Sequence, residues 1–363
     1  MDSAESQIIE RIRAAAREGT PLRIRGGGTK DFYGEPAGGE VLDTRPLAGI
    51  LSYEPSELVV TVRAGTPLAE LEAALSEKGQ CLPFEPPHFG EGATVGGMVA
   101  AGLSGPSRAS AGSVRDYVLG LSMINGAGET LLFGGQVMKN VAGYDVSRLL
   151  AGSLGTLGLI TAVSLKVLGR APAEATLKFG CTQAESLRML HAWGGKPLPL
   201  NASSWVSDKG VETLFVRLRG AVAAVEAACQ AMGGERLDNA AVAPDWNLAR
   251  ELALPWFEER GGRSLWRLSV AQTAPVLDLP ESPLVEWQGA QRWVRAAASD
   301  AAAIRREAAK GGGHATLFIA GEGAQGVARF DALKPPLDRI QRELKRQFDP
   351  HGIFNRGRLH PEY

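Results

Sequence analysis

The sequence has 363 residues, of which 44% are hydrophobic and 22% charged, and its formal net charge is −1. That length allows two hydrophobic cores, at roughly 150 residues per domain, and the near-zero charge excludes broad electrostatic binding to nucleic acid. Three widely spaced cysteines (Cys81, Cys181 and Cys229) exclude a disulfide framework and a close Cys-x-x-Cys metal set. No stretch is apolar for long enough to span a membrane, and no secretory signal is expected at the N-terminus.

The first elements are predicted to be one helix followed by short strands. Ile8, Ile9 and Ile12 recur at helical spacing before Gly19, which predicts an opening helix. Thr66 is predicted to cap a second helix that has Pro67 at its first position and ends at Gly79. Short strands are predicted at 22–25, 41–43, 50–53 and 58–62.

Two glycine-rich stretches interrupt these elements. Gly26, Gly27 and Gly28 follow the strand at 22–25, and without Cβ atoms they can adopt positive φ and turn their N–H groups toward one anion, although an ordinary surface turn is an alternative. The second stretch, at 90–105, contains Thr94 as a suitable helix N-cap. Neither has Rossmann or Walker spacing, so we expect a diphosphate held from two sides.

The segment at 81–113 is rich in Pro, Gly and Ser, which predicts sparse regular structure in a functional loop. Strands at 118–125 and 130–133 flank a turn at 126–128, which predicts a hairpin. A strand at 159–168 completes this part of the chain.

Beyond Arg170 the predicted order is β-α-β-β-α-β, which is typical of an antiparallel sheet with helices on one face. A final helix is predicted at 335–349. Its apolar residues at helical spacing are Leu337, Ile340, Leu344 and Phe348. The residues that interleave with them are Arg339, Arg342, Lys345 and Arg346, which predict a solvated basic face, with a binding patch as the alternative.

Several motifs resemble the vanillyl-alcohol-oxidase type, or PCMH-type, FAD-binding family. They are RGGGT at 25–29, ATVGGMVA at 93–100, VRDYVLG at 114–120, KNVAGYDVSRLLAGSLGTLGLIT at 139–161 and LKRQFDPHGIFNRGRL at 344–359. Within that family, EPPHFGE at 85–91 and GPSRASAGSVRD at 105–116 resemble the FAD-binding E subunits of bacterial glycolate oxidases.

The resemblance implies an α+β fold, in which a PCMH-type FAD-binding domain of two α/β subdomains (1–170) carries an antiparallel-sheet cap (171–330) and a C-terminal segment (331–363) returns to the FAD domain. It implies non-covalent FAD, because the histidine that often carries the flavin in this family is replaced here by glycine or threonine. The implied FAD-binding residues are Arg25, Gly26, Gly27, Gly28, Thr29, Thr94, Val95, Gly96, Gly97, Ala101, Ser104, Gly155, Leu159, Ile160 and Thr161.

Candidates for catalysis are weaker. Oxidation of a 2-hydroxy acid at a flavin needs a cation for the carboxylate and a base for the hydroxyl proton, and His88, Arg108 and Tyr144 are the candidates. The five histidines have no pair at ligand spacing, so no metal is expected. The tail reads Asn355-Arg356-Gly357-Arg358 where the family has Asn-Pro-Gly-Lys, which weakens the prediction that the tail touches flavin.

Three functions remain open. The resemblance implies an FAD subunit that oxidises glycolate, or D-lactate, and passes electrons to a second flavin subunit and an iron–sulfur subunit, in the cytoplasm or at the inner membrane through these partners. Alternatives are a structural or relay subunit whose partner does the chemistry, and a free-standing FAD oxidase. Five tryptophans of the cap are candidates for a partner surface or for core packing, namely Trp193, Trp205, Trp246, Trp256 and Trp266.

Overall fold

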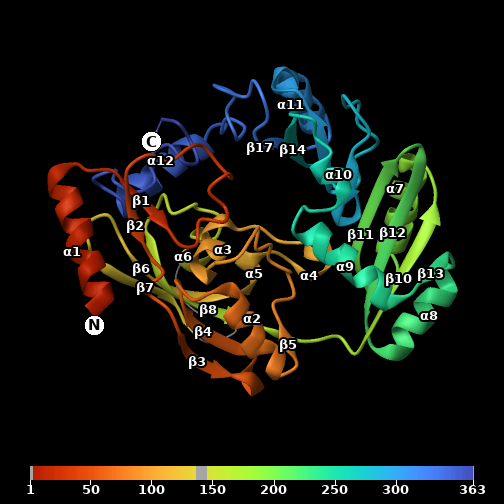
Figure 1. Cartoon of the computed structure of the whole chain (residues 1–363), viewed down its shortest axis with the longest axis horizontal. Helices are drawn as coiled ribbons and strands as arrows, with labels where there is room; N and C mark the ends of the chain where they lie inside the picture. The colour runs from red at the N-terminus through yellow and green to blue at the C-terminus, as the bar shows by residue number, and fades with distance from the viewer. Residues whose placement is uncertain (1–2, 136–144, 363) are drawn as a thin grey trace.

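The computed structural model describes residues 3–135 and 145–362. Two sheet systems lie on either side of a central region of short helices and loops (Figure 1). The first is a five-stranded antiparallel sheet of order β3-β4-β8-β6-β7. Its strands are β3 (Ile50–Glu54), β4 (Val59–Arg63), β6 (Val118–Ile124), β7 (Thr130–Gly134) and β8 (Leu159–Lys166), with η1 (Pro55–Glu57) between the first two. The predicted β6–β7 hairpin is confirmed, with Ile124 opposite Thr130.

Short helices cover this sheet and form the centre of the molecule. They are α2 (Leu68–Glu77), α3 (Val95–Ala101), α4 (Arg108–Ala111), α5 (Val114–Tyr117) and α6 (Val146–Leu149). α2 and α3 place Leu71, Leu75, Met98 and Val99 in one core with the sheet. The segment at 81–113 therefore has more regular structure than the sequence predicts.

A parallel pair of strands, β1 (Leu22–Arg25) and β2 (Glu40–Asp43), holds the first glycine loop. The predicted opening helix is confirmed as α1 (Ser3–Glu18), which packs on this pair through its isoleucines. The end of the chain lies at the other edge of β1, because the Leu22 N–H donates to the Ile353 carbonyl at 2.7 Å and the Asn355 N–H donates to the Leu22 carbonyl at 2.9 Å. A second short pair, β5 (Gln80–Cys81) and β9 (Leu168–Gly169), precedes the other half of the molecule.

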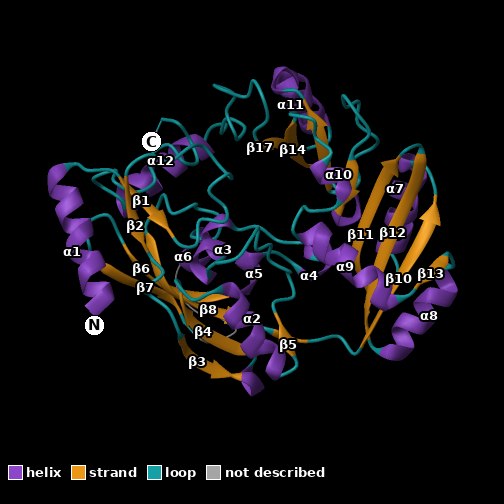
Figure 2. Cartoon of the chain, viewed as in Figure 1, coloured by secondary structure: helices purple, strands orange, loops and turns teal. Residues whose placement is uncertain are grey.

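The second system is an eight-stranded antiparallel sheet of order β13-β10-β12-β11-β15-β16-β14-β17 (Figure 2). Its strands are β10 (Ala173–Gly180), β11 (Leu200–Asp208), β12 (Val211–Gly220), β13 (Glu235–Leu237), β14 (Ser264–Ser269), β15 (Leu284–Glu286), β16 (Gln291–Ala296) and β17 (His314–Ile319). The predicted β-α-β-β-α-β order is confirmed in β10, α7, β11, β12, α8 and β13. These two sheet systems confirm the α+β class and the antiparallel cap sheet.

Helices cover both faces of the eight-stranded sheet. One face packs on α7 (Gln183–Gly194), α8 (Val222–Met232) and α11 (Ala301–Lys310), and the other on α9 (Asn239–Arg250) and α10 (Pro255–Glu258). The turns η2 (Trp287–Gly289) and η3 (Ala298–Asp300) follow β15 and β16. All five tryptophans considered above are less than 10% exposed, so they are core residues.

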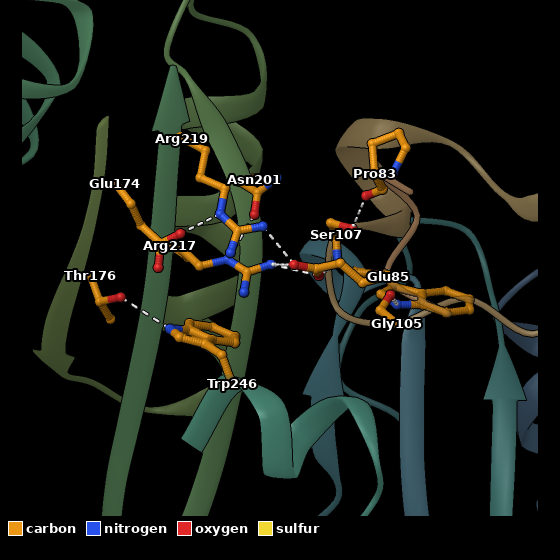
Figure 3. A network of polar contacts seen from close by, with 11 residues as sticks. Pro83, Glu85, Gly105, Ser107, Glu174, Thr176, Asn201, Arg217, Arg219 and Trp246 are labelled. Carbon is orange, nitrogen blue, oxygen red and sulfur yellow. Dashed lines mark hydrogen bonds and ion pairs between the residues drawn. The ribbon is translucent and has the colours of Figure 1, made fainter. Parts of the chain in front are cut away.

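A network around Glu85 joins the two halves of the molecule (Figure 3). Glu85 accepts hydrogen bonds from Arg217 Nη2 at 2.6 and 2.7 Å, from Arg219 Nη1 at 2.6 Å and from the Ser107 N–H at 3.1 Å. The Trp287 indole N–H also donates across this boundary, to the Gly105 carbonyl at 3.0 Å. Burial alone would raise the pKa of Glu85, but the two guanidinium groups hold that pKa below its usual value.

One prediction about a helix end is wrong. Thr66 does not cap α2, because its Oγ1 accepts the Gly49 N–H at 2.9 Å and Pro67 is the residue before the helix. In the last helix, α12 (Leu337–Phe348), the predicted apolar stripe is only half buried, since Leu337 is 55% and Ile340 45% exposed.

The basic face of α12 also differs from the prediction at one residue. Lys345 is buried, and its ammonium group donates to the carbonyls of Thr156 at 2.7 Å and Phe354 at 2.8 Å and to Asp349 Oδ2 at 2.7 Å. The helix is therefore fixed to the first half of the molecule by a charged residue as well as by Leu344 and Phe348. Within the described ranges, no helix is both long enough and apolar enough to cross a membrane.

Candidate functional site

The two glycine stretches lie directly against each other. A Cβ atom on Gly27 would lie 1.7 Å from the Gly92 carbonyl oxygen, and one on Gly26 would lie 2.3 Å from Thr94 Oγ1. Both distances are far below contact, so only glycine permits this approach. The sequence argument relied on positive φ, but of the three glycines only Gly28 has it, at 75°. Close approach is thus the main reason for Gly26 and Gly27.

The two stretches do not offer the same hydrogen-bond donors. The Val95 and Gly96 N–H groups donate to the carbonyls of Thr66 at 3.0 Å and Ala64 at 2.7 Å. The Gly97 N–H donates to Thr94 Oγ1 at 3.2 Å, which confirms Thr94 as the N-cap of α3. Protein acceptors therefore already use the N–H groups of Val95, Gly96 and Gly97.

The N–H groups that remain available to bind an anion lie on the first loop. Within residues 3–135 and 145–362, the N–H groups of Gly27 and Gly28 donate to no protein acceptor. They line a cavity of about 90 Å³, together with Arg25, Thr29, Thr94, Gly97 and Ala101 from the predicted set. This cavity also receives the side chains of Arg23, Lys30, Asp31 and Arg358, so its charge balance is positive.

A second cavity, of about 70 Å³, continues from the first and shares Ile24, Gly26, Gly97, Ala100, Leu154 and Asn355 with it. Its further lining includes Gly96, Gly155 and Ile160 of the predicted set. The site thus has a cationic end beside the glycine loop and a more apolar end beside β8. That arrangement matches a dinucleotide, which has a charged diphosphate between apolar rings.

Lys30 is a site residue that the sequence argument missed. Its ammonium group donates to the His88 carbonyl at 3.1 Å and lies 5.5 Å from the centre of the Phe89 ring. Burial lowers the pKa of Lys30 to about 8, although the Glu251 carboxylate acts in the opposite direction. In the sequence, the signal for Lys30 is its position directly after Thr29.

The C-terminal tail lines the site, contrary to the doubt raised by its sequence. Asn355 Oδ1 accepts the Ile24 N–H at 2.8 Å, and its Nδ2 donates to the Leu154 carbonyl at 2.6 Å. Arg358 donates to the carbonyls of Lys30, at 3.1 Å, and Glu35, at 3.0 Å. The tail therefore positions the glycine loop through backbone carbonyls.

Other predicted residues lie elsewhere. Val95 and Leu159 are fully buried in hydrophobic cores, and Thr161 lies in β8 outside both cavities. Ser104 lines a different cavity at the boundary of the two halves. Leu159, Thr161 and Val95 therefore support the site without lining it.

Two of the catalytic candidates, His88 and Arg108, do not line the two joined cavities. His88 Nε2 lies 3.0 Å from Glu72 Oε2, and the His88 N–H donates to Glu251. Arg108 lies over the Trp287 ring, 4.6 Å from its centre. Tyr144 falls outside the described residues. Among the residues that are described, no group of three or more His, Cys, Asp or Glu is placed to hold a metal.

The cavity that contains Ser104 is lined by three residues with a buried polar atom that has no partner among the described residues: Glu286 Oε1, Gln291 Oε1 and Arg267 Nε. The other carboxyl oxygen, Glu286 Oε2, accepts from Gln291 Nε2 at 2.8 Å and Trp293 Nε1 at 2.7 Å. Burial raises the pKa of Glu286 to about 7, against the lowering effect of those two hydrogen bonds. Sequence patterns gave no signal for this cluster.

Comparison with known proteins agrees with the geometry. Residues 3–134 match the family model described as FAD binding domain. The residues of this cavity suit that cofactor. Its glycines leave no room for a Cβ, two of its N–H groups have no acceptor among the described residues, and several cations line it. FAD is the cofactor of this domain.

Relatives and solved structures extend the comparison beyond that domain. The chain is 46% identical to the glycolate oxidase subunit GlcE of Escherichia coli (strain K12) over 355 residues, which is 98% of this chain and 97% of the relative. It is 33% identical to the glycolate oxidase subunit GlcD of Bacillus subtilis (strain 168) over 173 residues, 47% of this chain and 37% of that protein. An alkyldihydroxyacetonephosphate synthase structure superposes with a TM-score of 0.64 at 15% identity, covering 96% of this chain and 74% of that one, which shows a shared fold.

The family model covers residues 3–134, whereas the similarity to GlcE covers 98% of the chain and so runs through both sheets and the tail. The chain therefore belongs to the GlcE family of glycolate oxidase subunits, among the FAD-linked oxidoreductases.

Proposed function

We propose that this protein is the FAD-binding subunit of a multi-subunit glycolate oxidase, which converts glycolate to glyoxylate and accepts D-lactate as a second substrate. The observation that carries the proposal is the 46% identity to GlcE over nearly the whole of both chains. The joined cavities beside the glycine loop support it, because they offer a dinucleotide a cationic and an apolar end.

In this proposal the diphosphate of FAD lies at the Gly26–Gly28 loop. The Gly27 and Gly28 N–H groups donate to it and Lys30 and Arg25 balance its charge, because charged acceptors favour such donors. FAD supplies the acceptor for the hydride of the substrate. The protein's own residues bind the dinucleotide, exclude water and take up the hydroxyl proton. The cofactor is held without a covalent bond, so it is released on denaturation.

The domain division follows from the same reading. Residues 1–170 form the FAD domain, residues 171–330 form the cap, and residues 331–363 return to the FAD domain. The contacts of Ile353 and Asn355 with β1 support the last assignment.

The partners proposed are a second flavin subunit and an iron–sulfur subunit, which take the electrons onward. The complex is proposed to work in the cytoplasm, at the inner face of the membrane where a partner attaches it. Both relatives are named as subunits of a glycolate oxidase, which supports an assembly of several chains.

Anaerobic mixing of glycolate with the FAD-loaded full chain tests the proposal through the flavin absorbance. We expect bleaching, either by the chain alone or once the partner subunits are added. Equal bleaching of the partners with and without this chain would assign the substrate chemistry to them and leave this chain a structural or relay role.

A further inference from the structure

The boundary between the two halves contains a cavity separate from the dinucleotide cavities. The loops Pro87–Phe89 and Leu103–Pro106 form one wall, and the end of α9 together with β14, β15 and β16 forms the other. The eight-stranded sheet contributes Arg267, Glu286 and Gln291 to the lining, beside the aromatic rings of Trp293 and Phe318.

Strand register explains why these polar residues converge. Glu286 of β15 is opposite Gln291 of β16, and Trp293 of β16 is opposite Arg267 of β14. Residues opposite each other in antiparallel strands share a face, and so do residues two apart in one strand. Glu286, Gln291, Trp293 and Arg267 therefore all point from one face of the sheet toward the first half of the molecule.

The unpaired atoms form a chemically specific set. Glu286 and Gln291 are 3% and 2% exposed, yet Oε1 of each has no protein partner. Arg267 donates from Nη2 to the Tyr33 hydroxyl at 3.2 Å, while its Nε is buried without a partner. A buried polar group without a partner is costly, so a ligand that pairs with these atoms is favoured. Two acceptors need a donor such as a hydroxyl group, and an unpaired guanidinium N–H suits a carboxylate.

Resting on the function proposed above, we propose that this cavity receives the hydroxyl-bearing end of a small 2-hydroxy acid, with Glu286 as the proton acceptor, Gln291 as its positioning partner and Arg267 as the cation for the substrate carboxylate. The cavity volume of about 20 Å³ has room for one small polar group, such as the hydroxyl group of the substrate.

The step balances in atoms and electrons. Oxidation breaks the C–H and O–H bonds of the substrate carbinol and forms a C=O bond. FAD, when bound, would be the oxidant that accepts the hydride, and the Glu286 carboxylate would accept the proton. The charged side chains that face the same cavity are Arg250, from α9, and Arg267, from β14. Because burial raises the pKa of Glu286 to about 7, the fraction able to accept a proton increases through neutral pH.

The test uses the FAD-loaded chain in whichever form glycolate bleaches, alone or with partners. Glu286→Gln keeps the size of the side chain and removes the proton acceptor, and general bases contribute about 10²- to 10⁴-fold. We expect bleaching to slow at least about 100-fold, while FAD content and the Kd for oxalate, a carboxylate that cannot be oxidised, change less than about threefold. Arg267→Gln should weaken oxalate binding about tenfold or more, the loss of one charged hydrogen bond. Glu258→Gln, an exposed carboxylate of α10, is the matched control and should behave as wild type.

Bleaching by Glu286→Gln at the wild-type rate, or unchanged oxalate binding by Arg267→Gln, would overturn the assignment. Should Glu286→Gln fail to fold, the wild-type pH profile decides: we expect the bleaching rate to increase through about pH 7, and a flat profile contradicts the proposal. A wild-type chain that glycolate never bleaches, with or without partners, contradicts the proposed function itself. Bleached wild type with unaffected variants contradicts only the Glu286 site.

Discussion

Gly27 illustrates how a single residue sets the geometry of the dinucleotide site. Its missing Cβ lets the first glycine loop touch the Gly92 carbonyl. In this arrangement Gly27 and Gly28 line the cavity of about 90 Å³. The three glycines of this loop act differently, since Gly28 supplies a positive φ while Gly26 and Gly27 supply room.

Gly27→Ala is expected to lower FAD affinity at least tenfold, because a Cβ at 1.7 Å from a backbone oxygen forces the two loops apart. The measurement is the Kd for FAD by flavin fluorescence on the refolded chain. Gly38→Ala is the matched control, since a Cβ there meets nothing within 4 Å. Retention of FAD by Gly27→Ala with the affinity of Gly38→Ala would show that the loops do not need this approach.

The element α12 carries two kinds of residue that look alike in the sequence. Lys345 and Arg346 are adjacent cations, yet Lys345 is buried with three acceptors and Arg346 is exposed beside Glu343. Burial lowers the pKa of Lys345, while the ion pair with Asp349 opposes that change. Asp349 in turn accepts the N–H groups of Ile353 and Phe354, so this pair shapes the turn that leads the tail to β1.

Lys345→Met is expected to destabilise the chain by about 3 to 5 kcal/mol, the cost of breaking one partner of a buried ion pair. Urea unfolding followed by tryptophan fluorescence measures the free energy of unfolding. Arg346→Met on the same helix should change that free energy by about 0.5 kcal/mol or less. Equal effects of the two substitutions would mean that Lys345 is not a structural cation.

At the scale of the whole molecule, the Glu85 network couples the two halves (Figure 3). Glu85 itself has φ of 49°, a conformation that non-glycine residues adopt rarely. Its carboxylate holds Arg217 and Arg219 of β12 against the loop that also contributes Pro87 and Phe89 to the cavity of Glu286. The same network therefore fixes the distance between the walls of that cavity.

Glu85→Gln is expected to lower the free energy of unfolding by about 3 to 5 kcal/mol at pH 7, because it leaves two guanidinium groups without a counter-charge. The pKa of Glu85 is depressed below its ordinary value of 4.5 in the folded chain. Its contribution is therefore complete above that value and is lost as the pH falls below it. Wild type and variant should thus converge in stability toward acid pH, as measured by chemical unfolding across pH 3 to 7.

Glu226→Gln removes the exposed pair with Arg236 and is the control, with an expected change of about 1 kcal/mol or less. A pH-independent difference between wild type and Glu85→Gln would contradict this role.

The sequence by itself determined the strands, most helices, the α+β class and the glycine loop, because hydrophobic periodicity and glycine clusters are local properties that act over a few residues. The family resemblance likewise depended on contiguous motifs, and similarity to GlcE agrees with it. Local patterns also gave Thr94 its role as an N-cap.

Only the tertiary structure decided which donors remain available and which cations are buried. Val95 and Gly96 appear as good anion binders in the sequence, but their N–H groups pair with the carbonyls of Thr66 and Ala64, about thirty residues earlier in the chain. Lys345 reads as a surface residue until carbonyls from Thr156 and Phe354 surround it. Glu286, Gln291 and Arg267 meet because separate strands align in register, and alignment between distant segments leaves no mark in the spacing of residues along the chain.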